Sequence, residues 1–296
     1  MVEQGPGLRP PRRRTGRRIA AVLGLLAVIA IGVYAAIALV GSGSPQAAQS
    51  TPPSTTVPPP KPFRVVFPEG FTRAQMAQRV AVVAKIAKGE HRGKPHLSKK
   101  TYLAASKPRR VPRFGSEKRP LEGFLFPATY DFLAQTTSKQ LVAAQLAAFK
   151  RNFGSIDLSY AKSKNLTPYD VLTIASMVER EAQVPGERAK IAAVIYNRLH
   201  ARMPLGIDAT IRYGLNVPPT QSLTQSELAS DNPYNTRNRV GLPPTPIANP
   251  GLPSIKAAAH PAQVDYLYFV RKPDHRHHYF TSSFQDFLNH EKAYGY

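Results

Sequence analysis

Three glutamates lie around a predicted helix junction, and their type and spacing suit acid–base chemistry. Glu179 and Glu181 lie on opposite flanks of an apolar helical stripe, and Glu187 follows the helix-breaking Pro185 and Gly186. A carboxyl held partly out of water keeps its proton to higher pH and can protonate a leaving oxygen. We favour Glu181 for this role, although the pattern by itself does not rank the three. A glutamate on an amphipathic helix is more often a surface residue.

Two predicted helices, at 167–181 and 187–199, must position these carboxylates. Thr167 suits an N-cap, with Pro168 at the first helical position and Asp170 third after the cap. Glu187 falls in the first turn of the second predicted helix. Apolar residues recur at helical spacing in both ranges, at Val171, Ile174, Ala175 and Val178 and at Ile191, Val194, Ile195 and Leu199.

Other reaction classes find little support in this sequence. It contains no GxGxxG, no other phosphate-cradling loop and no GxSxG elbow. Cysteine is absent, which excludes disulfides and thiolate metal sites. A polar turn near the C-terminus could hold a metal, but it lacks established ligand spacing, and an exposed turn is the simpler interpretation. We therefore expect no metal and no cofactor; the residues of that turn are Asp274, His275, His277 and His278.

The chain is strongly basic. Its 296 residues carry a formal net charge of +22, which suits an anionic partner such as nucleic acid, anionic lipid or an acidic wall polymer. Much of this charge lies in 89–119, a segment rich in Pro and Gly with a short possible helix at 99–105. That segment is either a solvated face or a contact with anionic polymer or phospholipid head groups. Nucleic-acid binding finds no recognised motif, so we expect none.

The N-terminal region predicts a membrane anchor. Residues 1–18 hold six arginines, and 19–40 carry no charge over a length that spans a bilayer. The basic cluster places the N-terminus in the cytoplasm and the remainder outside. A cleaved signal peptide is the main alternative. Residues 41–62, rich in Ser, Thr and Pro, read as a linker that holds a domain away from the membrane.

The remaining patterns predict an α+β fold. A strand at 63–67 and a turn at 68–70 precede a helix from Thr72 to about Ala87. This strand–turn–helix unit is either a packing module or a LysM-like carbohydrate-binding unit. We divide the chain into 63–119, holding that unit and the basic segment, and 120–296, a mixed helical and strand catalytic domain. Within the second part we expect helices at 138–153, at 254–259 with Ser254 as cap, and at 284–294, and strands at 266–270 and 278–280.

Two further stretches of the second part bear on a binding cleft. The stretch 121–132 (LEGFLFPATYDF) interleaves aromatic residues with Glu122, and it forms either a sugar-stacking groove or a corner of the core. The long segment 216–263 is full of turn residues. We expect it to be an ordered loop that wraps a cleft, because structureless loops of this length are uncommon unless functional.

Eight sequence blocks follow one another in a fixed order: LEGFLFPATY (121–130), ASMVEREA (175–182), ERAKIAAVIYNRL (187–199), LGIDATIRYG (205–214), YNT (234–236), GLPPTPIANPG (241–251), AAAHPA (257–262) and YLYFV (266–270). By these blocks and their order, the sequence from Phe63 onward resembles the MltG/YceG-type endolytic murein transglycosylases. The family's catalytic acid is the second glutamate of its E-x-E segment, which corresponds to Glu181. Some relatives carry an additional LysM-like unit, whose place is taken here by the linker.

The resemblance implies lytic cleavage of peptidoglycan between MurNAc and GlcNAc within nascent strands. Glu181 would first protonate the glycosidic oxygen and then accept the proton of the MurNAc C6 hydroxyl, leaving a 1,6-anhydro end; one carboxyl can serve both steps. Glycan strands are then the expected partner, and peptidoglycan synthases are candidate protein partners. The chain is expected to be attached to the membrane through its one N-terminal helix. A non-catalytic wall-binding protein is the alternative. Residues expected to shape the cleft are Glu122, Asn197, Asp208, Tyr213, Asn235 and His260.

Overall fold

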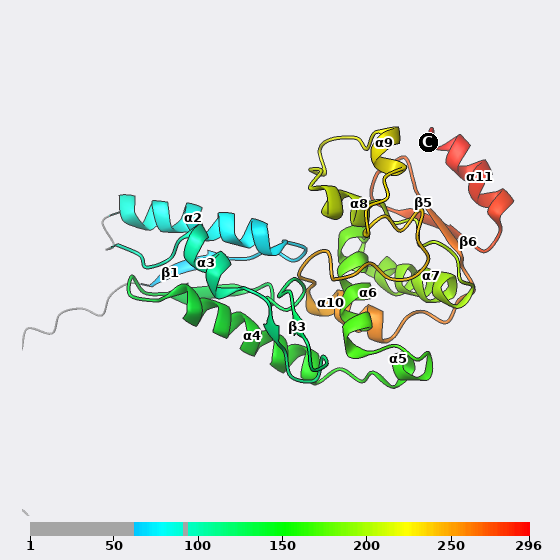
Figure 1. Cartoon of the computed structure of the whole chain (residues 1–296). Coiled ribbons are helices and arrows are strands. Elements are labelled where there is room, and N and C mark those ends of the chain that lie inside the picture. The colour runs from blue at the N-terminus through cyan, green and yellow to red at the C-terminus, as the bar shows by residue number, and fades with distance from the viewer. Residues whose placement is uncertain (1–61, 91–93) are drawn as a thin grey trace, which may run out of the picture. The chain divides into compact units, whose positions relative to one another are not determined.

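The structure, a computed structural model, describes residues 62–90 and 94–296, which belong to one compact unit (Figure 1). The predicted cytoplasmic tail at 1–18, the predicted transmembrane helix at 19–40 and the linker at 41–61 lie outside the described residues. Within the described part, none of the helices combines the length and apolar character needed to cross a bilayer.

Helices and short strands alternate along the described chain, in the α+β arrangement that the sequence predicts. The helices are α2 (Arg73–Gly89), α3 (Lys99–Ala105), α4 (Ser138–Gly154), α5 (Ser159–Ser163), α6 (Pro168–Glu181), the 3-10 helix η1 (Pro185–Glu187), α7 (Arg188–His200), α8 (Asp208–Leu215), α9 (Gln225–Leu228), α10 (Leu252–Ala259) and α11 (Phe284–Ala293). The strands are β1 (Phe63–Val66), β2 (Arg109–Arg110), β3 (Lys118–Arg119), β4 (Thr129–Phe132), β5 (Tyr268–Arg271) and β6 (His278–Thr281).

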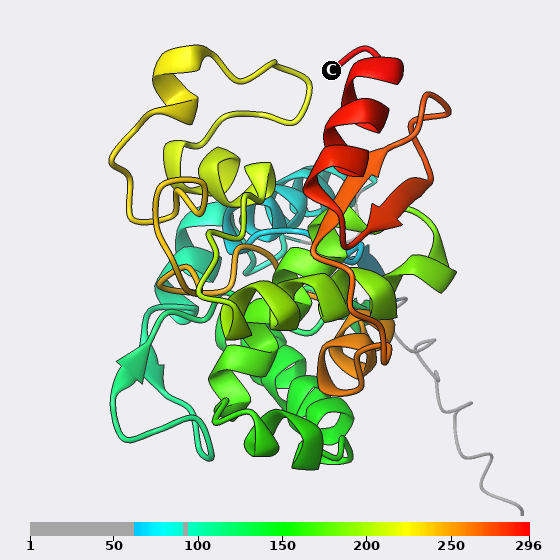
Figure 2. The ribbon, with the colours of Figure 1, turned by 90° about the vertical axis from the view of Figure 1, so that its right-hand side faces the viewer.

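The strands form three antiparallel pairs. β1 pairs with β4, so that Phe63 faces Phe132 across the ladder. This pair joins the ranges 63–119 and 120–296, between which the sequence suggested a division. β2 pairs with β3 in a short hairpin, and β5 pairs with β6 near the C-terminus. Figure 2 shows the β2–β3 hairpin in teal and β5 and β6 in orange.

Capping interactions fix the helix starts that the sequence predicts. The Thr72 hydroxyl accepts from the backbone N–H of Gln75, and the Gln75 side chain accepts in return from the backbone N–H of Thr72. Thr167 and Asp170 form the same reciprocal pair at the start of α6. These capping boxes satisfy N–H groups that a helix leaves without intrahelical partners.

α6 lies at the centre of the core. It packs against α10 and α7, and in Figure 1 α7 crosses it at a steep angle. The sequence predicts one apolar stripe, but residues on every side of the helix are buried between Tyr169 and Val178, including the polar Thr173 and Ser176. Both hydroxyls donate to backbone carbonyls within the helix, which makes their burial tolerable. α6 is therefore a fully covered helix, and Glu181 lies at its end.

The aromatic stretch 121–132 contributes to the core. Phe124 is fully buried and packs edge-on against Phe114, with ring centroids 4.9 Å apart. Phe149 lies on another side of the same ring, at 5.1 Å. Of the two interpretations left open by the sequence, the structure supports the core corner for this ring.

The long segment 216–263 is ordered, but its proline-rich part does not line the cavity at Glu181. Ile247 and Asn249 are buried, and the backbone N–H of Ile247 donates to the hydroxyl of Ser176 on α6. The following helix, α10, begins two residues before the predicted cap Ser254, with Gly251 as its N-cap. Ser254 therefore lies inside α10, because the proline next to it fits the first helical turn, where a backbone N–H has no intrahelical partner.

Candidate active site

Glu181 opens onto a cavity of about 700 Å³ at the end of α6. The helix ends at Glu181, and the backbone of its C-cap, Ala182, is extended. Segments far apart in the sequence surround the carboxyl, and the lining residues are Glu181, Arg198, Leu205, Gly206, Ile207, Asp208, Arg212, Arg237, Tyr268, Phe269, Val270, Arg271, His278, Phe284, Phe287, Leu288, Glu291 and Tyr296.

The environment of the Glu181 carboxyl favours the protonated form. Burial raises its pKa, and the negative charge of Asp208 raises it further. The guanidinium of Arg271 and, more weakly, that of Arg180 and the backbone N–H of Ala209 act in the opposite direction. Glu181 thus keeps its proton to a higher pH than an ordinary glutamate does. The cations beside it stabilise the ionised form.

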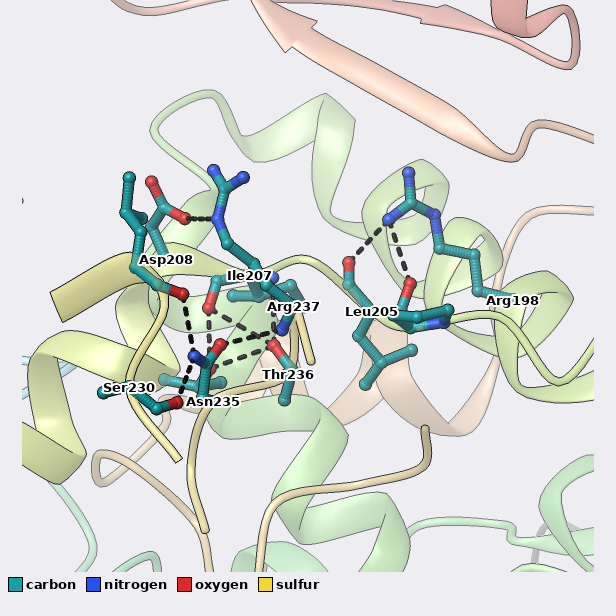
Figure 3. A network of polar contacts seen from close by, with 11 residues as sticks. Arg198, Leu205, Ile207, Asp208, Ser230, Asn235, Thr236 and Arg237 are labelled. Carbon is teal, nitrogen blue, oxygen red and sulfur yellow. Dashed lines mark hydrogen bonds and ion pairs between the residues drawn. The ribbon is translucent and has the colours of Figure 1, made fainter. Parts of the chain in front are cut away.

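Asp208 forms an ion pair across the cavity wall. Figure 3 shows its carboxylate accepting from the Arg237 guanidinium. The two atoms lie 2.7 Å apart, and both side chains are a little under half exposed. Asp208 is the first residue of α8, where a negative charge is favoured by the helix N-terminus. Arg237 comes from the long loop, so the pair joins α8 to that loop.

Buried hydrogen bonds hold the two members of this pair in place. The backbone N–H of Ile207 donates to the Thr236 hydroxyl at 3.0 Å (Figure 3). The Asn235 amide donates to the carbonyls of Leu228 and Ser230 at 2.9 and 2.7 Å. Because these bonds fix the residues just before Asp208 and Arg237, they set the position of both charged groups.

Arg198 forms another wall of the cavity. Its guanidinium donates to the carbonyl of Leu267 at 2.6 Å and to that of Leu205 at 2.7 Å, and it lies over the Tyr268 ring at 5.2 Å. These bonds connect α7 to both the turn before α8 and the segment entering β5. Burial lowers the pKa of Arg198, although an arginine remains charged at neutral pH.

The other two glutamates of the helix junction have structural partners. Glu179 accepts from the backbone N–H of Gly251 at 3.0 Å. Glu187, which lies at the end of η1 and not within α7, accepts from the backbone N–H and Nδ1 of His278 at 3.0 and 2.8 Å. Burial lowers the pKa of His278, so its ring is neutral at pH 7 and donates from Nδ1. In the described ranges no three candidate ligands cluster as a metal site would require.

The sequence pattern of the YceG-like family matches residues 46–293. The chain belongs to the YceG-like family. A crystal structure of a yceG-like protein from Listeria monocytogenes resembles it with a TM-score of 0.63 and 30% identity, covering 77% of this chain and 76% of that one. This likeness confirms the predicted α+β class.

Curated relatives carry the name endolytic murein transglycosylase. One from Bacillus subtilis (strain 168) is 35% identical over 216 residues, which are 71% of this chain and 59% of the relative. One from Streptococcus pneumoniae (strain ATCC BAA-255 / R6) is 34% identical over 238 residues, 75% of this chain and 43% of the relative. The chain thus spans about half the length of the curated relatives it matches.

Glu122 and Tyr213 of this YceG-like chain meet away from the Glu181 cavity. The Glu122 carboxyl is buried and accepts from the Arg73 backbone N–H at 2.8 Å, the Asn249 amide at 2.8 Å and the Tyr213 hydroxyl at 3.1 Å. Burial raises the pKa of Glu122 to about 7, against the effect of these hydrogen bonds. The cluster connects the start of α2, the 121–126 turn, α8 and the proline-rich loop.

The remaining predicted site residues lie in three places. Asn197 donates to the carbonyls of Val264 and Tyr266, both at 2.9 Å, and so positions the segment before β5. Asn235 supports the loop beneath Arg237. His260, the C-cap of α10, is exposed and lines a different hollow, together with residues such as Asp157.

The structure therefore brings Asp208, but none of the other five, into the Glu181 cavity. Sequence reasoning missed Arg237 and Arg271, whose charges face that cavity. Arg237 directly follows the YNT block, which was a usable signal. Arg271 ends β5, ninety residues after Glu181, and it directly follows the YLYFV block, which was a comparable signal.

Proposed function

We propose that this chain is an endolytic peptidoglycan lytic transglycosylase that cleaves between MurNAc and GlcNAc within nascent glycan strands. One observation carries the proposal: Glu181, the match to the family's catalytic acid, is a partly buried carboxyl with a raised pKa at the wall of a cavity. The names of the relatives from Bacillus subtilis and Streptococcus pneumoniae support the same activity.

In the proposed reaction the protonated Glu181 gives its proton to the glycosidic oxygen as the bond from MurNAc C1 to that oxygen breaks. The C6 hydroxyl of the same MurNAc then attacks C1, and Glu181 takes the hydroxyl proton. The products are a strand with a 1,6-anhydroMurNAc end and a strand with a free GlcNAc hydroxyl, and Glu181 returns to its starting form. A second catalytic carboxylate is unnecessary because the nucleophile belongs to the sugar.

The site geometry suggests how the other residues contribute. Asp208 and Arg237 lie on the cavity wall, where they can bind sugar hydroxyl or amide groups. Arg271 would stabilise the carboxylate that forms when Glu181 has given up its proton. Glu122, Asn197, Tyr213 and Asn235 are engaged with protein groups, so we infer that they shape the cleft indirectly; His260 would meet a distant part of the strand.

We also propose that residues 19–40 anchor the enzyme with its catalytic part outside the membrane, where it can limit the length of new strands, with peptidoglycan synthases as candidate partners. A LysM-like role for the strand–turn–helix unit at 63–87 is a further proposal, supported by the strand β1 followed by the helix α2. A reagent that cannot cross the membrane is expected to label Lys61 in intact cells, which would place this residue outside. A shortened N-terminus on the mature chain would instead indicate a cleaved signal peptide.

The decisive test of the activity uses the full chain and purified glycan strands. Mass spectrometry of the products is expected to show new 1,6-anhydroMurNAc ends and strands of intermediate length. Binding to the strands without any new ends would support the non-catalytic wall-binding alternative, and ends with a reducing MurNAc would indicate hydrolysis. Either outcome would overturn the proposed reaction.

A further inference from the structure

A second cavity, of about 450 Å³, lies between the β2–β3 hairpin and α4. That volume falls within the range of about 300–1,000 Å³ that is typical of small-molecule sites. Pro168, the first residue of α6, lines it, whereas Glu181 is the last residue of the same helix. With a rise of about 1.5 Å per residue, the helix places the two sites about 20 Å apart. The cavity is therefore separate from the candidate active site.

The wall of this cavity is apolar. Phe114, Phe149 and Phe153 are buried in it, and the rings of Phe114 and Phe153 lie 5.1 Å apart. Partly exposed side chains complete the wall, namely Val111, Leu146, Ile156 and Leu158. Transfer of an alkyl chain from water to such a wall is favourable, whereas a sugar or a polyphosphate chain has little apolar surface to bury there.

The rim of the cavity is cationic. Exposed basic residues surround the mouth, and the described residues that line it include no acid; these basic residues are Arg109, Arg110, Arg113, Lys150 and Lys162. None of the five forms a salt bridge with another part of the described chain. Asp157 reaches Lys162 only at electrostatic range. The rim thus has an uncompensated positive charge that attracts anionic head groups.

We propose that this cavity binds one acyl chain of an anionic phospholipid, with the lipid phosphate held by the rim. One fatty-acid carboxylate would need only one or two of these five cations. An anionic membrane surface carries many head groups and can pair with all of them. A wall polymer or a nucleic acid would neutralise the cations but leave the apolar wall unused. In this proposal the basic segment 89–119 supplies three of the rim cations that bind the lipid head group.

Photolabelling of the full chain in vesicles tests the proposal at the level of residues. The probe is phosphatidylglycerol with a photoreactive group in one acyl chain, and the comparison is phosphatidylcholine with the same chain. Peptide mapping is expected to find adducts of phosphatidylglycerol within 109–114 and 146–153 and far fewer adducts of phosphatidylcholine there. Adducts elsewhere in the chain do not enter this comparison, so an N-terminal anchor does not affect it.

Two pairs of variants separate charge from shape. The double variant Arg109→Gln with Arg110→Gln is expected to reduce these adducts about tenfold, whereas Lys99→Gln with Lys100→Gln removes equal charge outside the lining and retains them. Ala147→Trp fills the cavity and should abolish them, and Ala144→Trp, exposed on α4 but outside the lining, should not. Equal labelling by both lipids, no adducts in the two segments, or labelling there only by a photoreactive free fatty acid would each overturn the proposal.

Discussion

Glu181 and Arg271, the last residues of α6 and β5, face the same cavity, and the Arg271 charge opposes the burial that raises the pKa of the Glu181 carboxyl. The proposed reaction needs this balance, because one group must hold a proton at the start and bear a negative charge in the middle. Burial favours the first state and the guanidinium favours the second.

Replacement of Arg271 by Met is expected to move the alkaline limb of the pH profile of kcat/KM to higher pH. Only protonated Glu181 starts the reaction, so activity falls as pH rises through its pKa. Removal of a neighbouring cation raises that pKa further, which moves the limb upward. Arg271→Lys keeps the charge and should keep the limb near its original position. A limb that moves to lower pH in Arg271→Met would contradict this account of the site.

Asp208→Asn is expected to have the opposite effect on the same limb. Burial is the larger cause of the raised Glu181 pKa, and the Asp208 charge adds to it. Loss of that charge lowers the pKa of Glu181. The limb should therefore move to lower pH. Asp265→Asn, which removes an exposed carboxylate outside the cavity, is the matched control and should leave the profile in place.

Local signals made the longer helices and three of the strands predictable, whereas the short elements β2, β3, β4, α5, α8 and α9 were not predicted. Thr72 and Thr167 mark helix starts because a short polar side chain can satisfy the free N–H groups of the first turn. Runs of aromatic and β-branched residues likewise located β1, β5 and β6. The all-round burial of α6 was not predictable, because it depends on how α10 and the long loop pack against it, and these lie some seventy residues further on.

The site was predictable only in part. Glu181 and Asp208 lie within recognisable sequence blocks, and the structure places both residues in one cavity. The roles of Glu122 and Asn235 were harder to foresee, because a polar residue within a recognisable sequence block can equally contact a ligand or hold a loop. Their hydrogen-bond partners decide the matter, and these come from segments distant in the sequence.

Glu122 is expected to make the free energy of unfolding depend on pH between about 4.5 and 7. Its pKa rises from an ordinary 4.5 to about 7 on folding, so the folded chain binds an extra proton in that window. Stability therefore falls as pH rises through it, by up to about 3 kcal/mol from this group. Glu122→Gln keeps the size and most hydrogen bonds but cannot ionise, so it should lose this part of the decline.

Urea unfolding of both chains at pH 5 and pH 7.5 measures that difference. Other groups titrate alike in wild type and Glu122→Gln, so the difference between the two proteins gives the contribution of Glu122 to the pH dependence of stability. An equal decline in wild type and Glu122→Gln would show that the Glu122 carboxyl is not linked to stability in this way.

Gly123→Ala is expected to destabilise the fold by about 3 kcal/mol. Gly123 has φ +87°, and an added Cβ would lie 2.8 Å from Pro246 and 3.2 Å from Leu172. The substitution thus combines backbone strain with a clash between the 121–126 turn and the proline-rich loop. Gly186→Ala, where the added Cβ meets nothing within 4 Å, should change stability by less than about 0.5 kcal/mol. Comparable losses in the two variants would exclude this explanation.

The most direct test of the central claim is the rate at which Glu181→Gln forms 1,6-anhydroMurNAc ends on purified glycan strands. Glutamine has nearly the same shape but can neither give nor accept the proton, so kcat/KM should fall by about a thousandfold. Glu227→Gln is the matched control, because Glu227 is remote from the cavity and glutamine can preserve its capping box. Wild-type rates are expected for this control. Anhydro ends formed by Glu181→Gln at the wild-type rate would contradict the account.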